Sequence, residues 1–320
     1  MPHVSILRHG FAQTQTSGQA GSPTKLVSVS NLLVNADDFG LTPGVNRSIA
    51  ELHRAHALSS ATLMATGKFF DDAVATAHAN PTLEVGCHIL LVDGTPALPP
   101  QQIPPLCPNG RTFRDTLTHF VRDLFTFRIR AEEIIAEATA QIRRLQAAGI
   151  PVSHIDTHKH THLFSGILRP LLGAAQTCQV PAIRNPFEPD WALRVTRGSA
   201  TFFRRAAVIA LQSQHRAFQR AVRTSGLATT SGTIGVLATG TLNVRETLRS
   251  LLAALPPSPP QALPPDPNQT WELVCHPGYP DAALDQVRTR LRASRAAEHE
   301  ALLELLPAIP LATWSSLTAG

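Results

Sequence analysis

The sequence predicts an α/β fold, specifically a TIM-like (β/α) barrel that is irregular or incomplete. The chain has 320 residues, of which 43% are hydrophobic, and this size suits one large α/β domain. Strand-like apolar runs alternate with helical patterns from about residue 31 onward, which is typical of a parallel sheet. The glycine-rich motifs G-x-G-x-x-G and G-x-x-x-x-G-K-[ST] do not occur, which disfavours the open nucleotide-binding sheets.

The chain divides into a short extension and one domain. Residues 1–29 are rich in Ser, Thr, Gln and Gly, so we expect a disordered N-terminal extension, with a single domain over 30–320. The extension contains no long apolar stretch typical of a secretion signal. The four cysteines lack disulfide-framework spacing, and we expect reduced thiols in a cytoplasmic protein. They are Cys87, Cys107, Cys178 and Cys275.

In the first half of the chain, strand-like runs at 31–35, 61–65 and 83–89 are separated by helical patterns. The first helix is predicted to begin near Thr42-Pro43, where Thr42 can cap the helix and Pro43 fits the first helical position. The next helix is expected over 69–79, and a Pro-rich loop of about 25 residues follows the third strand.

In the second half, a helix over about 130–148 is predicted to end at Gly149, before Pro151. Asn243 and Glu246 have capping-box spacing at the start of a later helix. The other expected elements are strands at 152–158, 180–184, 232–236 and 271–278, helices over 166–178, 198–224 and 284–305, and a Pro-rich loop over 256–267. The total of roughly seven β–α units favours the barrel.

Ionisable residues follow several of the predicted strands. In barrels of parallel strands, catalytic groups lie at the carboxyl ends of the strands. Four clusters meet this condition. They are Asp37-Asp38, His88, the run from His154 to His162, and His276.

The run HIDTHKHTH at 154–162 is the strongest chemical signal in the chain. His154, Asp156, His158, His160 and His162 recur with period two, so on an extended segment they share one face. Imidazole is the commonest metal ligand, and a neighbouring carboxylate usually orients the ring. The run therefore favours a metal site over a surface loop that binds metal adventitiously.

Together these segments resemble a known family. V-N-A-D-D-F-G-L-T-P-G-V-N at 34–46, G-C-H-I at 86–89, H-x-D-x-H-x-H-x-H at 154–162 and C-H-P-G at 275–278 are similar to the YdjC-like (ChbG-type) carbohydrate deacetylases. The resemblance covers about residues 31–280. It implies a barrel-like fold, one divalent metal ion, Zn²⁺ or Mg²⁺, and hydrolysis of the acetamide group of an N-acetylated sugar.

The resemblance also implies residue roles. The metal ligands are expected at Asp38, His88 and His158. Asp37 matches the general base, His276 matches the general acid, and Arg184 is placed to pair with Asp37. For Asp156 the alternatives are orientation of the His158 ring and structural hydrogen bonding. For His160 and His162 the alternatives are contact with the sugar and structural hydrogen bonding.

Two further segments resemble one branch of the family, the hopanoid-biosynthesis-associated deacetylases (HpnK). They are L-V-D-G-T-P-A-L-P-P at 91–100 and G-V-L-A-T-G at 235–240. This branch implies N-acetylglucosaminyl bacteriohopanepolyol as substrate. The alternatives are a chito-oligosaccharide deacetylase, a metal phosphoesterase or amidohydrolase, and a non-catalytic sugar- or lipid-binding protein.

The charge distribution suggests a partner surface. The formal net charge is +5, and the segment 191–225 contains seven arginines and no acidic residue. Such a helix, with apolar residues between the arginines, can lie on the anionic inner face of a membrane. The alternative is an ordinary outer helix with a solvated arginine face. We expect no nucleic-acid partner. The arginines are Arg194, Arg197, Arg204, Arg205, Arg216, Arg220 and Arg223.

Overall fold

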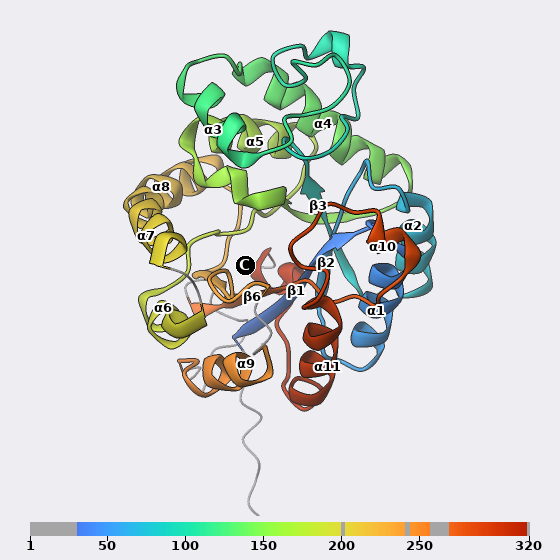
Figure 1. Ribbon diagram of the computed structural model, residues 1–320, viewed down its shortest axis with the longest axis vertical. Helices are drawn as coiled ribbons and strands as arrows, with labels where there is room; N and C mark the ends of the chain where they lie inside the picture. Colours follow the sequence, from blue (N-terminus) through green and yellow to red (C-terminus); the bar gives the residue numbers. More distant parts are fainter. Residues whose placement is uncertain (1–30, 200–201, 241–243, 257–268, 319–320) are drawn as a thin grey trace, which may run out of the picture.

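The centre of the protein is a curled parallel sheet of six strands in the order β4-β3-β2-β1-β6-β5 (Figure 1). The computed structural model describes residues 31–199, 202–240, 244–256 and 269–318. The predicted extension at 1–29 and the predicted cap Asn243 lie outside the described residues. The strands are β1 (Leu32–Phe39), β2 (Ser60–Leu63), β3 (Glu84–Ile89), β4 (Val152–Thr157), β5 (Gly232–Ile234) and β6 (Trp271–Cys275).

β1 is the central strand, and every residue of it is buried. It pairs in parallel with β2 on one side and with β6 on the other. A strand covered on both faces reads as a continuous apolar run, which explains the segment LLV at its start. The two acids at its far end are therefore fixed at the middle of the sheet.

Helices surround the sheet on its outer side (Figure 1). None of the described helices has the length and apolar character needed to cross a membrane. The α-helices are α1 (Pro43–Arg54), α2 (Phe70–Ala79), α3 (Leu117–Phe125), α4 (Ala131–Ala147), α5 (Ser165–Thr177), α6 (Asp190–Val195), α7 (Phe202–Leu211), α8 (His215–Ser225), α9 (Val244–Ala253), α10 (Ala282–Asp285), α11 (Arg295–Leu305) and α12 (Trp314–Thr318). The 3₁₀ turns are η1 (Pro100–Gln102), η2 (His158–Leu163), η3 (Thr196–Ser199) and η4 (Gln212–Gln214).

The α/β class is confirmed, but the described strands do not close a complete (β/α) barrel. The strand predicted at 180–184 is replaced by isolated bridges that pair Ile155 with Ile183 and Ala182 with Ala228. Pro181 cannot donate a ladder hydrogen bond, which explains why pairing stays local. Beyond it, the Thr233 N–H donates to the Phe187 carbonyl at 3.0 Å, so this segment still lies against β5.

The predicted start of α1 and the predicted end of α4 are confirmed, and both predictions came from local sequence signals. The Thr42 side chain accepts a hydrogen bond from the Val45 N–H at 3.2 Å, and Pro43 is the first residue of α1. α4 ends two residues before Gly149, which has a φ of 78°. Side-chain capping and left-handed glycine act within one turn of chain, so the sequence alone reveals them.

Two long helices predicted from the sequence are broken. The segment 198–224 is divided by η4 between α7 and α8. The segment 284–305 is divided into α10 and α11. Asp281 caps α10 by accepting from the Leu284 N–H at 2.6 Å, and the Arg292 guanidinium binds the Asp285 and Val287 carbonyls at 3.0 and 2.8 Å. These contacts satisfy the carbonyls at the end of a short helix, so the chain turns there.

The amino end of the sheet is closed by the C-terminal helix. Trp314 of α12 is completely buried, and its ring stacks on His154 with centroids 4.2 Å apart. The Glu84 carboxylate at the start of β3 accepts hydrogen bonds from the backbone N–H groups of Trp314 and Ser315. The amino ends of β3 and β4 are therefore covered by α12.

Candidate metal and catalytic centre

Both acids of the N-A-D-D-F-G segment reach one site because the backbone reverses its alternation at Asp38. Asp38 has a φ of 64°, and the pairing of β1 with β2 shifts register between Ala36 and Phe39. On a regular strand, adjacent side chains point to opposite faces. A left-handed residue is uncommon, but Asp tolerates it better than most residues do. This single residue allows two adjacent carboxylates to serve one centre.

Asp38, His88 and His158 form a compact group of ligand atoms. Asp38 Oδ1 lies 3.7 Å from His88 Nε2 and 3.6 Å from His158 Nδ1, and the two nitrogens are 3.3 Å apart. The three side chains come from the ends of β1 and β3 and from the start of η2. The structure therefore brings together the three residues that were predicted as metal ligands.

The spacing of these atoms fits a divalent ion. Two ligands about 2.1 Å from a tetrahedral ion lie about 3.4 Å apart. The three separations, from 3.3 to 3.7 Å, are close to this value. Two imidazole nitrogens and one carboxylate leave an open position, and such a donor set suits Zn²⁺ better than Mg²⁺, which prefers oxygen ligands.

The His88 ring is fixed by a second carboxylate. Its Nδ1–H donates to Asp156 Oδ1 at 2.8 Å, which leaves Nε2 facing Asp38 and His158. Burial lowers the pKa of His88, but the carboxylates of Asp156, Asp37 and Asp38 outweigh burial and raise it to about 9. A metal ion bound at Nε2 would displace a proton from this ring, as metal binding to imidazole generally requires. We predicted Asp156 beside His158; its hydrogen bond goes to His88 instead.

The imidazole ring of His158 is uncharged at neutral pH. Burial lowers its pKa to about 4, because desolvation outweighs the attraction of Asp38. Its side chain is 22% exposed, the most exposed of the three candidate ligands. A neutral imidazole that faces the mouth of the site is ready to bind a metal without losing a proton.

Asp37 lies in a network centred on Arg184, which shares Asp156 with His88. The Arg184 guanidinium donates to Asp37 Oδ1 at 2.7 Å and to Oδ2 at 3.0 Å, and it also binds Asp156 and Glu272. Burial raises the pKa of Asp37, but the charge of Arg184 outweighs burial and holds that pKa well below its usual value. The predicted pairing of Arg184 with Asp37 is present. Arg184 is completely buried, and three carboxylates share its single positive charge.

His276 lies at the end of β6, next to Asp37. Its Nε2 is 3.7 Å from Asp37 Oδ2, and its side chain is 11% exposed. Its Nδ1 has no hydrogen-bond partner among the described residues. The predicted acid and the predicted base therefore face each other, and one His276 nitrogen is unengaged.

The predicted extended run of histidines ends earlier than expected. β4 stops at Thr157, and Lys159 and His160 have φ values of 57° and 51° within η2. The period-two interpretation is therefore wrong beyond His158. It is also misleading for His154, which packs on Trp314 at the opposite end of the sheet.

His160 and His162 have different surroundings. His162 is completely buried, and its Nδ1 shares a 2.6 Å hydrogen bond with Thr157 Oγ1. His160 Nδ1 has no hydrogen-bond partner in the part of the chain that the structure describes, and burial together with the positive charge of Arg184 lowers the pKa of His160 to about 3. His162 therefore has a structural contact, whereas His160 remains a neutral group close to the centre.

Three residues of the centre were not predicted. Arg295 donates to Asp38 Oδ2 at 2.5 Å, Glu298 accepts from the His276 N–H at 2.6 Å, and Glu272 binds Arg184. Glu272 gives a faint signal, since it is a lone acid inside the apolar run of β6. Arg295 and Glu298 give none, because arginine and glutamate three apart on a helix are common on solvated surfaces.

The chain is similar in sequence to known proteins. Residues 31–305 match the family described as YdjC-like protein. The chain is 40% identical over 156 residues to a carbohydrate deacetylase of Brevibacillus brevis, covering 49% of this chain and 59% of that protein. It is 35% identical over 153 residues to a carbohydrate deacetylase of Vibrio parahaemolyticus, covering 47% and 57%. The matched region thus spans less than two thirds of these relatives.

A solved structure has the same overall fold. It is a crystal structure from Enterococcus faecalis V583 of a protein provisionally named as a cellobiose-phosphate cleavage protein. The superposition has a TM-score of 0.66 at 24% identity, and it covers 90% of this chain and 98% of the other. At this identity the likeness concerns the fold alone.

Proposed function

Since the chain belongs to the YdjC-like protein family, we propose that it is a metal-dependent carbohydrate N-deacetylase. The observation that carries the proposal is the joint placement of two acid–base groups, Asp37 and His276, beside the ligand group of Asp38, His88 and His158. Amide hydrolysis needs a nucleophilic water, a polarised carbonyl and a proton for the departing amine. The centre offers a group for each need.

Asp38, His88 and His158 would hold the ion, Zn²⁺ or Mg²⁺. When bound, it supplies water activation and polarisation of the acetamide carbonyl. Asp37 receives the proton of the attacking water, because Arg184 binds both oxygens of this carboxylate and keeps it ionised. Asp37 also accepts from Asn35 Nδ2 at 3.1 Å, which restricts its rotation.

His276 delivers a proton to the sugar nitrogen as the carbon–nitrogen bond breaks. The products are acetate and the free amine. His276 is suited to this role because its Nε2 faces Asp37, while its backbone is fixed by α11. A positioned acid or base of this kind contributes about 10²–10⁴-fold in rate.

For the substrate we propose an N-acetylglucosamine-type sugar, and within this class N-acetylglucosaminyl bacteriohopanepolyol. The segments at 91–100 and 235–240 support the hopanoid substrate through their resemblance to the HpnK branch. A chito-oligosaccharide is the alternative within the same reaction. A two-metal phosphoesterase or amidohydrolase, and a non-catalytic binding protein, are alternatives of other classes.

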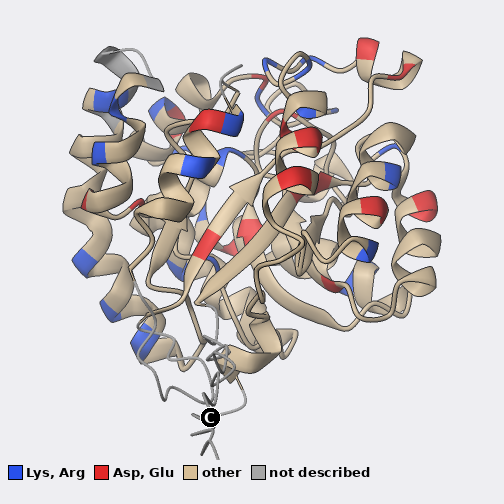
Figure 2. Cartoon of the chain, turned by 90° about the horizontal axis from the view of Figure 1, so that it is seen from below, with Lys and Arg blue, Asp and Glu red and all other residues tan. Residues whose placement is uncertain are grey.

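A lipid-linked substrate agrees with a peripheral contact between the arginine-rich helices and the anionic inner face of a membrane. Basic residues recur along the helices at the left of Figure 2, where α7 and α8 lie. Arg169 and Arg220 line a groove of about 530 Å³ between α5 and α8. Ile209 of α7 is 61% exposed. Exposed apolar and basic groups together suit an anionic lipid surface.

The decisive experiment measures acetate release with and without a chelator. Acetylated glucosaminyl hopanoid and chito-oligosaccharides are compared at equal concentration. We expect release to stop with chelator and to return with Zn²⁺ or Mg²⁺. Two tightly bound ions per chain would favour the phosphoesterase class, and absence of acetate from every substrate would favour the binding protein.

Membrane contact is tested separately by co-sedimentation with vesicles of anionic or neutral lipid at low salt. The proposed contact predicts binding to the anionic vesicles only, which weakens as salt rises. Failure to bind anionic vesicles at low salt would remove this part of the proposal.

A further inference from the structure

We infer that Arg295 and Glu298 are positioning residues, which couple the metal ligand Asp38 to the acid–base residue His276 through one turn of α11. The inference rests on the proposed function and extends it to a helix that carries none of the predicted site residues. Arg295 and Glu298 are three positions apart, so their side chains leave the same face of the helix.

Arg295 determines which oxygen of Asp38 faces the two histidines. Its Nη2 donates to Asp38 Oδ2 at 2.5 Å, and Oδ1 is left 3.7 Å from His88 Nε2 and 3.6 Å from His158 Nδ1. With Oδ2 bound to the guanidinium, Asp38 offers a metal ion one oxygen. The charge-assisted bond also fixes the carboxylate plane.

The same arginine reaches the backbone of His276. Its Nη1 donates to the His276 carbonyl at 3.4 Å, and its own carbonyl accepts from the Gly278 N–H at 3.2 Å. A β-carbon at Gly278 would lie 3.2 Å from Arg295 Cδ and 3.0 Å from Val45 Cγ2. The chain after β6 is thus packed directly against Arg295.

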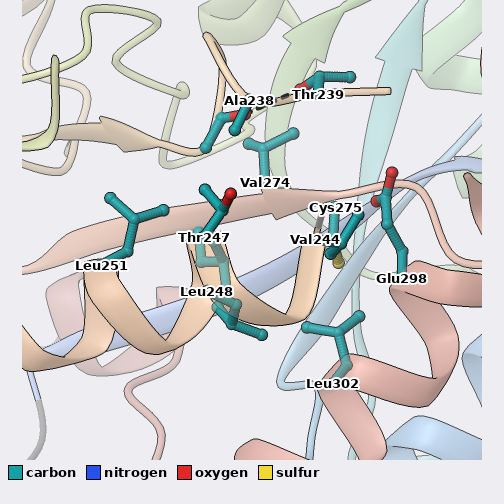
Figure 3. Close-up of a pocket in the computed structure, with 12 residues that line it drawn as sticks. Ala238, Thr239, Val244, Thr247, Leu248, Leu251, Val274, Cys275, Glu298 and Leu302 are labelled. Atoms are coloured by element: carbon teal, nitrogen blue, oxygen red, sulfur yellow. Dashed lines mark hydrogen bonds between the residues drawn. The ribbon is translucent and has the colours of Figure 1, made fainter. Parts of the chain in front are cut away.

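Glu298 binds the second polar backbone group of His276, its N–H. Its Oε2 accepts from the His276 N–H at 2.6 Å, and its Oε1 accepts from the Ser294 hydroxyl at 3.3 Å. Figure 3 shows Glu298 rising from α11 toward the end of β6 at Cys275. Both polar backbone groups of His276 are therefore bound by side chains of one helical turn.

Burial makes these contacts strong determinants of geometry. The Arg295 side chain is 1% exposed and the Asp38 side chain 6%, so neither charge has water as an alternative partner. A buried charge left without its partner is strongly unfavourable. A displacement of α11 must therefore move Asp38 and His276 together, which keeps the position of one relative to the other constant.

The test uses the full-length protein with Arg295→Met, Arg295→Lys and Glu298→Gln. Isothermal calorimetry with Zn²⁺ or Mg²⁺ alone measures metal affinity, and acetate release at saturating metal measures kcat and KM. We expect Arg295→Met to weaken metal binding by about 10–100-fold, the range for groups that orient a ligand. Arg295→Lys recovers part of this loss, because an ammonium reaches Asp38 but cannot also bind the His276 carbonyl.

Glu298→Gln tests the bond to the His276 backbone separately from the bond between Arg295 and Asp38. We expect metal affinity to stay within about threefold, kcat to fall by about tenfold or more, and KM to change little, because only the orientation of His276 is affected. The His276 backbone amide proton should move upfield in an NMR spectrum, since a charge-assisted hydrogen bond becomes a neutral one.

Arg292→Met and Glu300→Gln are the controls, because Arg292 binds carbonyls of a neighbouring turn and Glu300 is exposed on α11. Both should leave metal affinity and kcat unchanged. The inference is overturned if Arg295→Met and Glu298→Gln behave like these controls. If Arg295→Met does not fold, the same measurements on Arg295→Lys and Glu298→Gln test the inference in its place.

Failure of the proposed function gives a different pattern. A wild-type protein that binds metal but releases no acetate would refute the deacetylase proposal. In that case calorimetry and the chemical shift of the His276 amide would still test the role of Arg295 and Glu298. A wild-type protein that binds no divalent metal would refute the part concerning Asp38.

Discussion

Asp37 and Asp38 share one peptide bond, yet each is ion-paired with a different arginine. Arg184 binds both oxygens of Asp37, and Arg295 binds Oδ2 of Asp38. The left-handed conformation of Asp38, with a φ of 64°, brings both carboxylates to one centre, where each has its own arginine. Two adjacent like charges are therefore each compensated, and Asp38 lies beside His88 and His158 whereas Asp37 faces His276.

This separation predicts opposite outcomes for substitutions at the two positions. Asp37→Asn should keep metal affinity within about threefold and lower kcat by about 10²-fold or more, because the proton acceptor is lost. Asp38→Asn should lose metal binding, because an uncharged amide replaces the carboxylate ligand. Calorimetry with metal alone and acetate release at saturating metal measure the two effects, and near-normal turnover in Asp37→Asn would refute its role as base.

The hydrogen bond from His88 to Asp156 makes a second prediction. Asp156→Asn should lower metal affinity by about 10–100-fold, because His88 loses the carboxylate that fixes its Nδ1–H and directs Nε2 to the site. Glu272→Gln is the matched control, since Glu272 also binds Arg184 but does not touch His88. Equal losses in both variants would mean that Asp156 acts through Arg184 instead.

Much of the fold and part of the centre were predictable because the signals are local. Thr42 and Pro43 are adjacent, so the start of α1 could be predicted within one turn. The residues Asp38, His88 and His158 each end a strand or directly follow one, and parallel strands bring such ends to one edge. Their meeting follows from topology once the strands are recognised.

The remaining features depend on contacts between distant segments. Arg295 is 257 positions from Asp38, and nothing in the sequence around either residue indicates that they meet. The end of β4 at Thr157 was missed for another reason. Histidines and Asp156 occupy every second position from 154 to 162, which suggests an extended strand. Lys159 and His160 nevertheless adopt left-handed backbone angles, which are uncommon for residues other than glycine. Tertiary packing, not local preference, selects that turn.

Outside the centre, Asp123 should contribute to stability in acid. Hydrogen bonds from Arg122 and Arg114 lower its pKa to about 2. A carboxylate with a lowered folded-state pKa stabilises the protein above about pH 4, and this stabilisation disappears as pH falls toward 2. We expect Asp123→Asn to lower the free energy of unfolding at neutral pH by at most about 2 kcal/mol, because solvent screens the exposed Arg122.

The difference between wild type and Asp123→Asn should shrink between pH 4 and pH 2, as measured by guanidinium denaturation at each pH. Asp285→Asn serves as control, because the Asp285 side chain is 70% exposed and its arginine partner is 3.9 Å away. A difference that is constant across this interval would contradict the assignment.

The histidines that follow β4 should fall into two classes. His158→Gln should lose metal binding, because its Nδ1 belongs to the ligand group. His162→Gln should retain metal binding but lower the melting temperature, because His162 is completely buried and its ring is bound to Thr157 at 2.6 Å. Loss of a buried hydrogen bond costs about 1–3 kcal/mol. Calorimetry and thermal unfolding of the metal-free proteins distinguish the two effects, and loss of metal in His162→Gln with an unchanged melting temperature would place His162 among the ligands.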